Sequence, residues 1–299
     1  MTPSLTQMTP PPPKEPAFVC IYGPSGVGKT TDCGYSFPTG LFLAAPGALK
    51  PLRSVCGYDP ATAAVEDIEQ ATALVRKAAK GGQYDSIIVD DLSFLAEQTF
   101  AKVEKRASGF RMWGLLRDIV LDFRDACRLE AKCHVVVNCW ETVPTTKPDG
   151  TRVRGGPALS GKLPEQLPAM CDKVYRAVHE PNRKPWPSTY RCFLDPNYVM
   201  KDRDGVVDPA PMNLAEILRD AGYVVGRHKD LLWQEEIVES LAQQWVALPI
   251  DQHIPAANAA YQMLLEAGIH PLHARWTIRD AMDRSTLRRA RAVKFATFI

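Results

Sequence analysis

Short continuous runs of apolar residues alternate with amphipathic stretches along the first half of the chain. The apolar runs fit buried strands, whereas the stretches between them repeat their apolar residues at helical spacing. The expected strands are 18–22, 40–45, 87–91 and 134–139. The expected helices are 31–35, 61–80, 92–106 and 111–131. Because each strand is a continuous apolar run between helices, the pattern predicts an α/β fold with a mainly parallel sheet covered on both faces.

The rest of the chain differs from this alternation. Residues 174–178 and 190–194 fit two further strands, which can extend the sheet in an antiparallel sense, and from about residue 213 the pattern is helical and strand-poor. A run of four prolines lies in the first 16 residues. We therefore expect a disordered or polyproline tail over 1–16, an α/β core over 17–207 and a small helical C-terminal region over 208–299.

Composition narrows the class of protein. The chain has 299 residues, of which 45% are hydrophobic and 23% charged, and its net charge is only +2. These values fit a globular protein and neither favour nor exclude a nucleic-acid partner. The N-terminus lacks a secretory signal, no apolar run is long enough to cross a membrane, and the eight cysteines form no C-x-x-C pair. We therefore expect a cytoplasmic protein with reduced thiols and no membrane contact.

Residues 23–30, GPSGVGKT, match the phosphate-binding loop G-x-x-x-x-G-K-[ST] at every fixed position. They follow the expected strand 18–22 and open a helix, which is the context that this motif requires. The glycines let successive N–H groups face a polyphosphate, while Lys29 reaches the β- and γ-phosphates and Thr30 binds Mg²⁺. The predicted nucleotide contacts are Gly23, Pro24, Ser25, Gly26, Val27, Gly28, Lys29, Thr30 and Thr31.

Two acids end the buried run 87–91. Such a strand delivers a carboxylate to the carboxyl edge of a parallel sheet, where ligands bind. We expect Asp90 to hold Mg²⁺ opposite Thr30, as a Walker B aspartate does. Asp91 is well placed to cap the helix that follows, and it is also a candidate catalytic base.

The series IYGPSGVGKTT, YDSIIVDDLSFL and HVVVNC resembles RecA-type P-loop ATPases. Within that family the chain is most similar to compact ATPases encoded by bacteriophages, including RecA-like single-strand annealing proteins. The resemblance covers residues 17–207. It implies a three-layer RecA-like fold in which strand 134–139 lies between the P-loop strand and strand 87–91. It also implies ATP and Mg²⁺ as ligands, single-stranded DNA as a partner, and a homo-oligomer with ATP at its subunit boundaries.

The resemblance carries family roles onto three segments. The polar residue after strand 134–139 senses the γ-phosphate in the family, and that place holds Trp140 and Glu141 here. The next loop, 144–156, is basic and mobile by composition, and its counterpart contacts single-stranded DNA in RecA-like recombinases. Residues 200–205, MKDRDG, resemble the basic K-x-R-x-G stretch that can face a neighbouring subunit's nucleotide. There Lys201 or Arg203 would stabilise charge on the transferred phosphoryl group.

One departure from the family concerns hydrolysis. RecA-type enzymes usually carry a catalytic glutamate just after the second strand, whereas residues 43–48, LAAPGA, contain no acid. Glu141 or Asp91 could orient the attacking water instead. The catalytic candidates are therefore Lys29, Asp91, Glu141, Lys201 and Arg203, and hydrolysis is expected to be slow.

Two basic segments are candidates for nucleic-acid contact. In the loop 144–156, Lys147, Arg152 and Arg154 could neutralise backbone phosphates, or the loop could simply be a solvated surface. Trp140 at its root could stack on a base or pack beneath the loop. Near the C-terminus, Arg284, Arg288 and Arg291 would share one helix face, which fits either a nucleic acid or an exposed helix.

Two functional hypotheses remain open at the level of the sequence. The first is a RecA-like ATPase that oligomerises on single-stranded DNA and promotes annealing or recombination. The second is a nucleotide-binding assembly or structural protein with little or no turnover. The basic loop and the K-x-R-x-G stretch favour the first hypothesis, and the missing glutamate favours the second.

Overall fold

A computed structural model describes residues 14–50, 52–53, 59–159, 163–180, 188–192, 195–206, 208–225 and 229–267, with a few positions between 277 and 285. The chain divides into two compact units, Met1–Lys50 with Pro60–Gly226, and Pro51–Asp59 with Arg227–Ile299. The first unit contains the large sheet and the P-loop. The proline run of the predicted tail and the basic residues Arg284, Arg288 and Arg291 lie outside the described residues.

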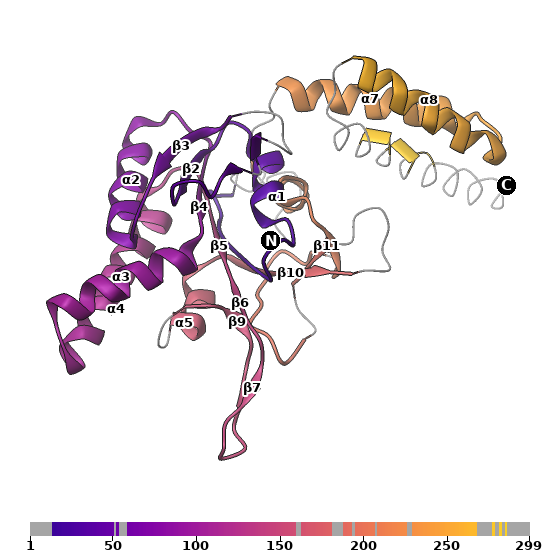
Figure 1. The fold of residues 1–299 in the computed structure, drawn as a ribbon. Coiled ribbons are helices and arrows are strands. Elements are labelled where there is room, and N and C mark those ends of the chain that lie inside the picture. Colours follow the sequence, from indigo (N-terminus) through magenta and orange to yellow (C-terminus); the bar gives the residue numbers. More distant parts are fainter. Residues whose placement is uncertain are drawn as a thin grey trace, which may run out of the picture. The chain divides into compact units, whose positions relative to one another are not determined.

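An eight-stranded sheet forms the centre of the first unit, in the order β12-β11-β10-β1-β5-β4-β2-β3 (Figure 1). The strands from β10 to β3 pair in parallel, and β11 and β12 add an antiparallel edge. Their bounds are β1 Phe18–Tyr22, β2 Leu41–Ala44, β3 Ala61–Ala64, β4 Ser86–Asp90, β5 His134–Cys139, β10 Lys173–His179, β11 Ser188–Arg191 and β12 Ala210–Pro211. β5 therefore lies between the P-loop strand β1 and β4, as the family resemblance implied.

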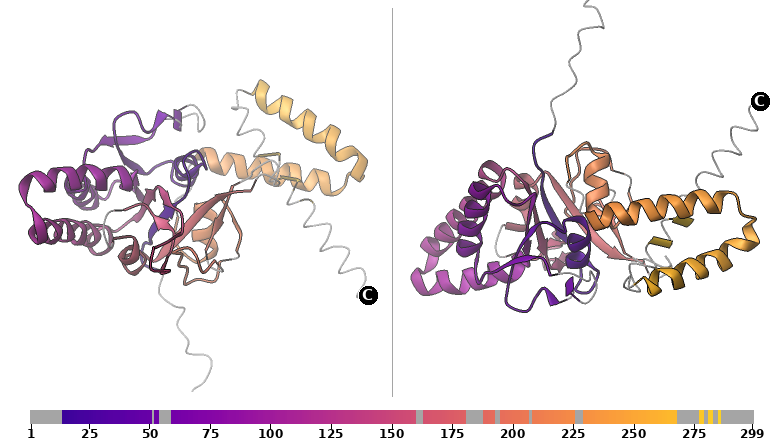
Figure 2. Two further views of the ribbon diagram at one scale, coloured as in Figure 1. Left: turned by 60° about the horizontal axis from the view of Figure 1, so that its bottom comes forward. Right: turned by 90° about the horizontal axis from the view of Figure 1, so that it is seen from above.

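Helices cover both faces of the sheet, so the unit has three layers (Figure 2). Buried side chains of α2, α3 and α4 share one apolar cluster with alternate residues of β1, β4 and β5. Helix α1 contacts β5 and α6 on the other face. The bounds are α1 Lys29–Ser36, α2 Ile68–Gly81, α3 Leu92–Arg106, α4 Gly109–Asp125, α5 Leu163–Met170 and α6 Leu214–Asp220. The predicted three-layer, mainly parallel α/β fold is thus confirmed.

Two of the predicted helices have different bounds in the structure. The expected helix 61–80 begins instead as strand β3, whose residues pair in parallel with β2, and only continues as a helix from Ile68. The helix begins there because the side chain of Asp67 accepts a hydrogen bond from the backbone N–H of Gln70 at 2.8 Å. The expected helix 111–131 is α4 followed by a π-helical turn over Ala126–Glu130.

The basic segment after β5 forms an antiparallel hairpin rather than an irregular loop. Strand β6 (Glu141–Thr142) pairs with β9 (Gly156–Pro157), and β7 (Thr145–Thr146) pairs with β8 (Arg152–Val153). We call residues 141–157 the hairpin arm, which extends away from the sheet in Figure 1. The composition of the turn residues 147–150 suggested mobility, but the threonine and valine residues on either side form strand pairs.

The second unit is helical in its described part. Helix α7 (Lys229–Val246), the short 3-10 helix η4 (Ile250–Gln252) and helix α8 (His253–Glu266) follow one another. Val238, Ala242 and Trp245 of α7 pack with Ala257 and Leu264 of α8 in a small apolar core. None of the helices in the described part of the chain is long and apolar enough to cross a membrane. The seven described cysteines are free thiols, and six of them are buried.

Candidate nucleotide-binding site

The phosphate-binding loop joins β1 to α1 at the carboxyl edge of the sheet. Gly26 and Gly28 have φ angles of 78° and 104°, in the left-handed region where a Cβ is strained. Gly28 is also the N-cap of α1. At Gly23 a Cβ would lie 2.4 Å from the carbonyl oxygen of Ala177 in β10, so only glycine fits beside that strand. The loop therefore has the glycine-dependent backbone that a phosphate cradle requires.

The Lys29 side chain folds back onto the backbone of the loop. Its Nζ atom donates hydrogen bonds to the carbonyl oxygens of Gly23 at 2.8 Å and Pro24 at 3.0 Å, and only 8% of the residue is exposed. Burial lowers the pKa of Lys29, while the negative charges of Asp91 and Asp90 oppose this shift. A buried ammonium among acids at the start of a helix is suited to bind a polyphosphate.

Thr30 and Asp90 meet across the gap between α1 and β4. The Thr30 hydroxyl donates a hydrogen bond to Asp90 Oδ2 at 2.7 Å, and Asn138 Nδ2 donates to Asp90 Oδ1 at 3.0 Å. Burial raises the pKa of Asp90, and both hydrogen bonds oppose this shift. A hydroxyl and a carboxylate at this separation are hard oxygen ligands of the kind Mg²⁺ prefers. The residues therefore fit the metal that the motif implies.

Asn138 is a site residue that the sequence interpretation missed. The interpretation placed the polar sensor after β5, at Trp140 and Glu141, whereas the side chain that contacts Asp90 lies within the strand. Asn138 is fully buried, and its Oδ1 atom lies 3.6 Å from the Cys33 thiol that donates to it. The available signal was an amide in the otherwise apolar run HVVVNC, because a buried amide needs partners.

Asp91 caps helix α3. Its Oδ1 accepts a hydrogen bond from the backbone N–H of Ser93 at 2.7 Å, and the Ser93 hydroxyl in turn accepts one from the Trp140 N–H at 2.9 Å. Burial, with a smaller contribution from the nearby charge of Asp90, raises the pKa of Asp91 to about 6. Asp91 is therefore both a cap and a carboxyl group that can change its protonation near neutral pH.

Glu141 lies at the first residue of the hairpin arm in an ion pair. Its Oε1 atom accepts a hydrogen bond from Arg176 Nε at 2.5 Å, and only 8% of its side chain is exposed. Its charge is among those that favour the charged form of Lys29. Trp140 itself is 39% exposed at the root of the arm.

The three predicted nucleic-acid contacts lie on the hairpin arm. The side chains of Lys147 and Arg152 are exposed near its tip. Arg154 lies near the base, and although exposed, its guanidinium donates a hydrogen bond to the carbonyl oxygen of Tyr198. Arg154 therefore makes a contact within the protein. This differs from the expectation that all three cations are available to a ligand.

The structure does not bring Lys201 and Arg203 to the phosphate-binding loop of the same chain. Lys201 pairs through its backbone with Val174 in the first half of β10, and its Nζ donates to the carbonyl oxygen of Cys171, which precedes that strand. These contacts lie toward the amino end of β10, whereas the P-loop follows the carboxyl end of β1. Arg203 is exposed.

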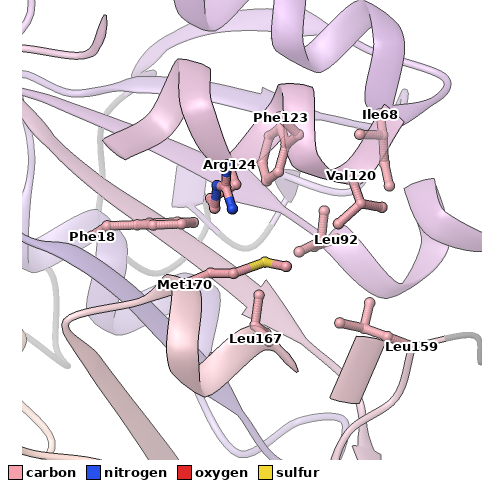
Figure 3. Close-up of a pocket in the computed structure, with 9 residues that line it drawn as sticks. All are labelled: Phe18, Ile68, Leu92, Val120, Phe123, Arg124, Leu159, Leu167 and Met170. Atoms are coloured by element: carbon pink, nitrogen blue, oxygen red, sulfur yellow. The ribbon is translucent and has the colours of Figure 1, made fainter. Parts of the chain in front are cut away.

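A separate cavity of about 20 Å³ lies within the apolar layer between the sheet and its helices (Figure 3). Phe18, Leu92, Phe123 and Leu167 are among its lining side chains. It has room for about one water molecule and almost no polar lining, so it is a packing defect and not a ligand site.

A match to a protein family agrees with this geometry. Residues 15–203 match the family model described as an AAA domain. No curated protein matches the chain. Among solved structures, the RadB recombinase is 13% identical, with a TM-score of 0.38 over 63% of this chain and 92% of that one. A KaiC-like protein, PH0186 from Pyrococcus horikoshii OT3, is 14% identical, with a TM-score of 0.38 over 62% of this chain and 83% of that one. Both similarities are too distant to bear on activity.

Proposed function

The chain belongs to the AAA domain family and is a P-loop ATPase with a RecA-like sheet, and on this premise we propose that it uses ATP and Mg²⁺ to act on single-stranded DNA. The proposed outcome is annealing or recombination. The observation that supports the nucleotide site best is the hydrogen bond of 2.7 Å between Thr30 and Asp90 beside Lys29. That the protein is phage-encoded and works in the host cytoplasm stays a prediction.

In this proposal each residue of the site has a separate role in binding or hydrolysing the nucleotide. The N–H groups of residues 23–31 cradle the phosphates, and Lys29 exchanges the Gly23 and Pro24 carbonyls for phosphate oxygens. Thr30 and Asp90 hold Mg²⁺, which neutralises phosphate charge when bound. Asn138 fixes the orientation of Asp90. Asp91 or Glu141 orients the attacking water and accepts its proton.

The DNA part of the proposal rests on the hairpin arm. Lys147 and Arg152 lie exposed on it, and Trp140 is partly exposed at its root. Cations along an extended arm can follow a phosphate backbone, and an indole can stack on a base. In a homo-oligomer, Lys201 or Arg203 would reach the nucleotide of a neighbouring subunit. For Lys201 to reach that nucleotide, its hydrogen bond to the Cys171 carbonyl oxygen would first have to break.

A second function is supported by one observation. Residues 43–48, at the end of β2, contain no acid at the place where RecA-type enzymes usually carry a catalytic glutamate. A protein that binds nucleotide to stabilise an assembly, with little or no turnover, would need only the loop, Thr30 and Asp90.

Steady-state ATP hydrolysis, measured with and without single-stranded DNA, separates the two functions. The recombination-type function predicts turnover that DNA stimulates and that Lys29→Ala abolishes. Lys80→Ala, at an exposed position in the last turn of α2, is the matched control and should retain the wild-type rate. Nucleotide binding without turnover, unaffected by DNA, would instead support the assembly function.

A further inference from the structure

A buried ion pair joins the hairpin arm to the sheet next to the phosphate-binding loop. Arg176 lies in β10 directly opposite Tyr22, the last residue of β1 before the loop. Its Nε atom donates to Glu141 Oε1 at 2.5 Å, and the two side chains are only 19% and 8% exposed. A carboxylate so buried needs its partner, because an unpaired charge there would be strongly unfavourable.

Arg176 has a second set of contacts, with segment 197–199. The ring centroid of Tyr198 lies 3.5 Å from the guanidinium carbon of Arg176, so the two groups stack. The phenol of Tyr22 donates to the carbonyl oxygen of Val199 at 2.8 Å. The same segment therefore contacts both the arginine and the P-loop strand.

Segment 197–199 also holds the base of the arm. The Gly155 N–H donates to the Asn197 carbonyl at 2.8 Å, and the Val199 N–H donates to the Gly155 carbonyl at 2.9 Å. Arg154 adds a hydrogen bond to the carbonyl oxygen of Tyr198. The contacts from the arm to Tyr198, from Tyr198 to Arg176, and from Arg176 to Glu141 form one continuous path.

We propose that Arg176 is a positioning residue, which holds the carboxylate of Glu141 at the nucleotide site and joins that site to the base of the hairpin arm. The proposal rests on the proposed function and takes Glu141, of its two candidates Asp91 and Glu141, as the residue that orients the attacking water. Arg176 acts through Glu141 and needs no contact with the nucleotide. Because Nε makes the pair while the plane of the guanidinium stacks on Tyr198, lysine can replace the charge but not the stacking.

Steady-state kinetics of four variants test the first half of this proposal. We expect Glu141→Gln to lower kcat about a hundredfold. Arg176→Gln should lower kcat about tenfold or more without raising the KM for ATP, and Arg176→Lys should recover part of that loss. The double variant, with Glu141→Gln and Arg176→Gln together, should have a kcat no lower than that of Glu141→Gln alone, since the two residues act as a unit.

Arg191 provides the matched control. It lies opposite Arg176 in the β10–β11 ladder and pairs with Glu180 at 2.8 Å, so it is also a strand arginine paired with a glutamate. Arg191→Gln should keep the wild-type kcat. Equal losses in Arg176→Gln and Arg191→Gln, an unchanged kcat in Arg176→Gln, or additive losses in the double variant would each overturn the proposal.

Hydrogen exchange tests the second half without requiring turnover. Binding of a non-hydrolysable ATP analogue with Mg²⁺ should change the exchange rates of the Gly155 and Val199 amides in the wild type and in Arg191→Gln, but not in Arg176→Lys. The same change in all three proteins would overturn the link to the arm. If the wild type shows no Lys29-dependent turnover, the proposed function fails, and the exchange measurement alone decides whether the link exists.

Discussion

Asn138 donates a hydrogen bond to Asp90 across the middle of the sheet, with 3.0 Å between Nδ2 and Oδ1. Both residues are buried near the ends of neighbouring parallel strands, β5 and β4. The Thr30 hydroxyl occupies the other oxygen of the same carboxylate. The two side chains together fix the direction in which Asp90 faces the phosphate-binding loop.

Replacing Asn138 should therefore weaken both the fold and the site. In Asn138→Ala a buried carboxylate loses one of its two side-chain donors, which should lower the free energy of unfolding by about 1–3 kcal/mol. The affinity for ATP with Mg²⁺ should also fall, because Asp90 is free to turn. Urea denaturation and nucleotide titration measure the two effects. Gln98→Ala, which removes an exposed amide from α3, should change neither, and equal effects would contradict the role of Asn138.

Asp91 should set the acidic limb of the pH–rate profile if it accepts the proton of the attacking water. Its pKa is raised to about 6 by burial, so the carboxyl is protonated and inactive as a base below that pH and ionised above it. We expect kcat/KM, which reports the free enzyme, to rise about tenfold per pH unit up to that value and then to level. Asp91→Asn should abolish activity yet keep its stability, since asparagine also caps helices, whereas Asp91→Ala should lose about 1 kcal/mol. Full activity in Asp91→Asn would assign the water to another residue.

Asp32 in α1 should make the stability of the protein depend on pH. It is fully buried and accepts hydrogen bonds from the Tyr190 hydroxyl and the Leu214 N–H, yet burial raises its pKa from 3.8 to about 6. The folded state therefore binds the proton of Asp32 more tightly than the unfolded state does. The stability that this difference contributes is complete below pH 3.8, the pKa in the unfolded chain, and is lost as the pH rises through about 6. The loss amounts to about 3 kcal/mol.

The free energies of unfolding of the wild type and of Asp32→Asn, measured from below pH 3.8 to above pH 6, check this pH dependence. The difference between the two proteins should change in favour of the variant as the pH rises, because asparagine has no charge to bury. A difference that stays constant with pH would show that Asp32 does not titrate in the folded protein.

The base of the hairpin arm should not accept a side chain at Gly155. A Cβ there would lie 2.6 Å from the Thr142 carbonyl oxygen and 2.6 Å from Cε1 of Tyr198. Gly155→Ala should cost about 1–3 kcal/mol, because the Thr142 carbonyl is part of the paired backbone and cannot easily move. Gly114→Ala is the matched control. Apart from its chain neighbours and the backbone of its own helix, no described atom lies within 4 Å of a Cβ at Gly114 in α4, and this change should stabilise the protein by up to about 1 kcal/mol.

The cations of the arm should contribute unequally to any binding of single-stranded DNA. Lys147→Gln and Arg152→Gln should each reduce the slope of log affinity against log salt by about 0.7, the value for one phosphate contact on a single strand. Arg154→Gln should change the slope less, because Arg154 is held by the Tyr198 carbonyl. Fluorescence titrations at several salt concentrations would measure the slopes. Identical slopes in all four proteins would exclude the arm as the phosphate-binding surface.

The elements that the sequence predicts well are those in which local pattern and tertiary environment agree. Strand β5 and helix α3 have their predicted bounds, because a continuous apolar run and a helical stripe each meet a matching buried surface. Residues 61–64, ATAA, have a good helix-forming composition but form an edge strand, because pairing with β2 outweighs the local preference. The pattern of the sequence contains no information about that pairing.

The same distinction applies to the site. Lys29 and Thr30 are neighbours in the motif, and Asp90 comes close to them because β1 and β4 end at the same edge of the sheet with only β5 between them. The partners that lie far apart in the chain were not predictable in this way. Arg176 and Glu141 form their pair only because β10 and the root of the arm lie on the same edge of the sheet, and nothing in either local sequence indicates the other.

The amino end of α6 rests on two side chains of the P-loop helix, with Leu214 donating to Asp32 at 3.2 Å and the Ala215 N–H donating to Ser36 at 3.0 Å. A truncated protein that ended at residue 207 would lack α6. Asp32 and Ser36 would then lose these hydrogen bonds and become exposed to water. A fragment prepared for crystallisation or for nucleotide titration should therefore keep the chain to at least residue 225, so that the helix bearing Lys29 retains its support.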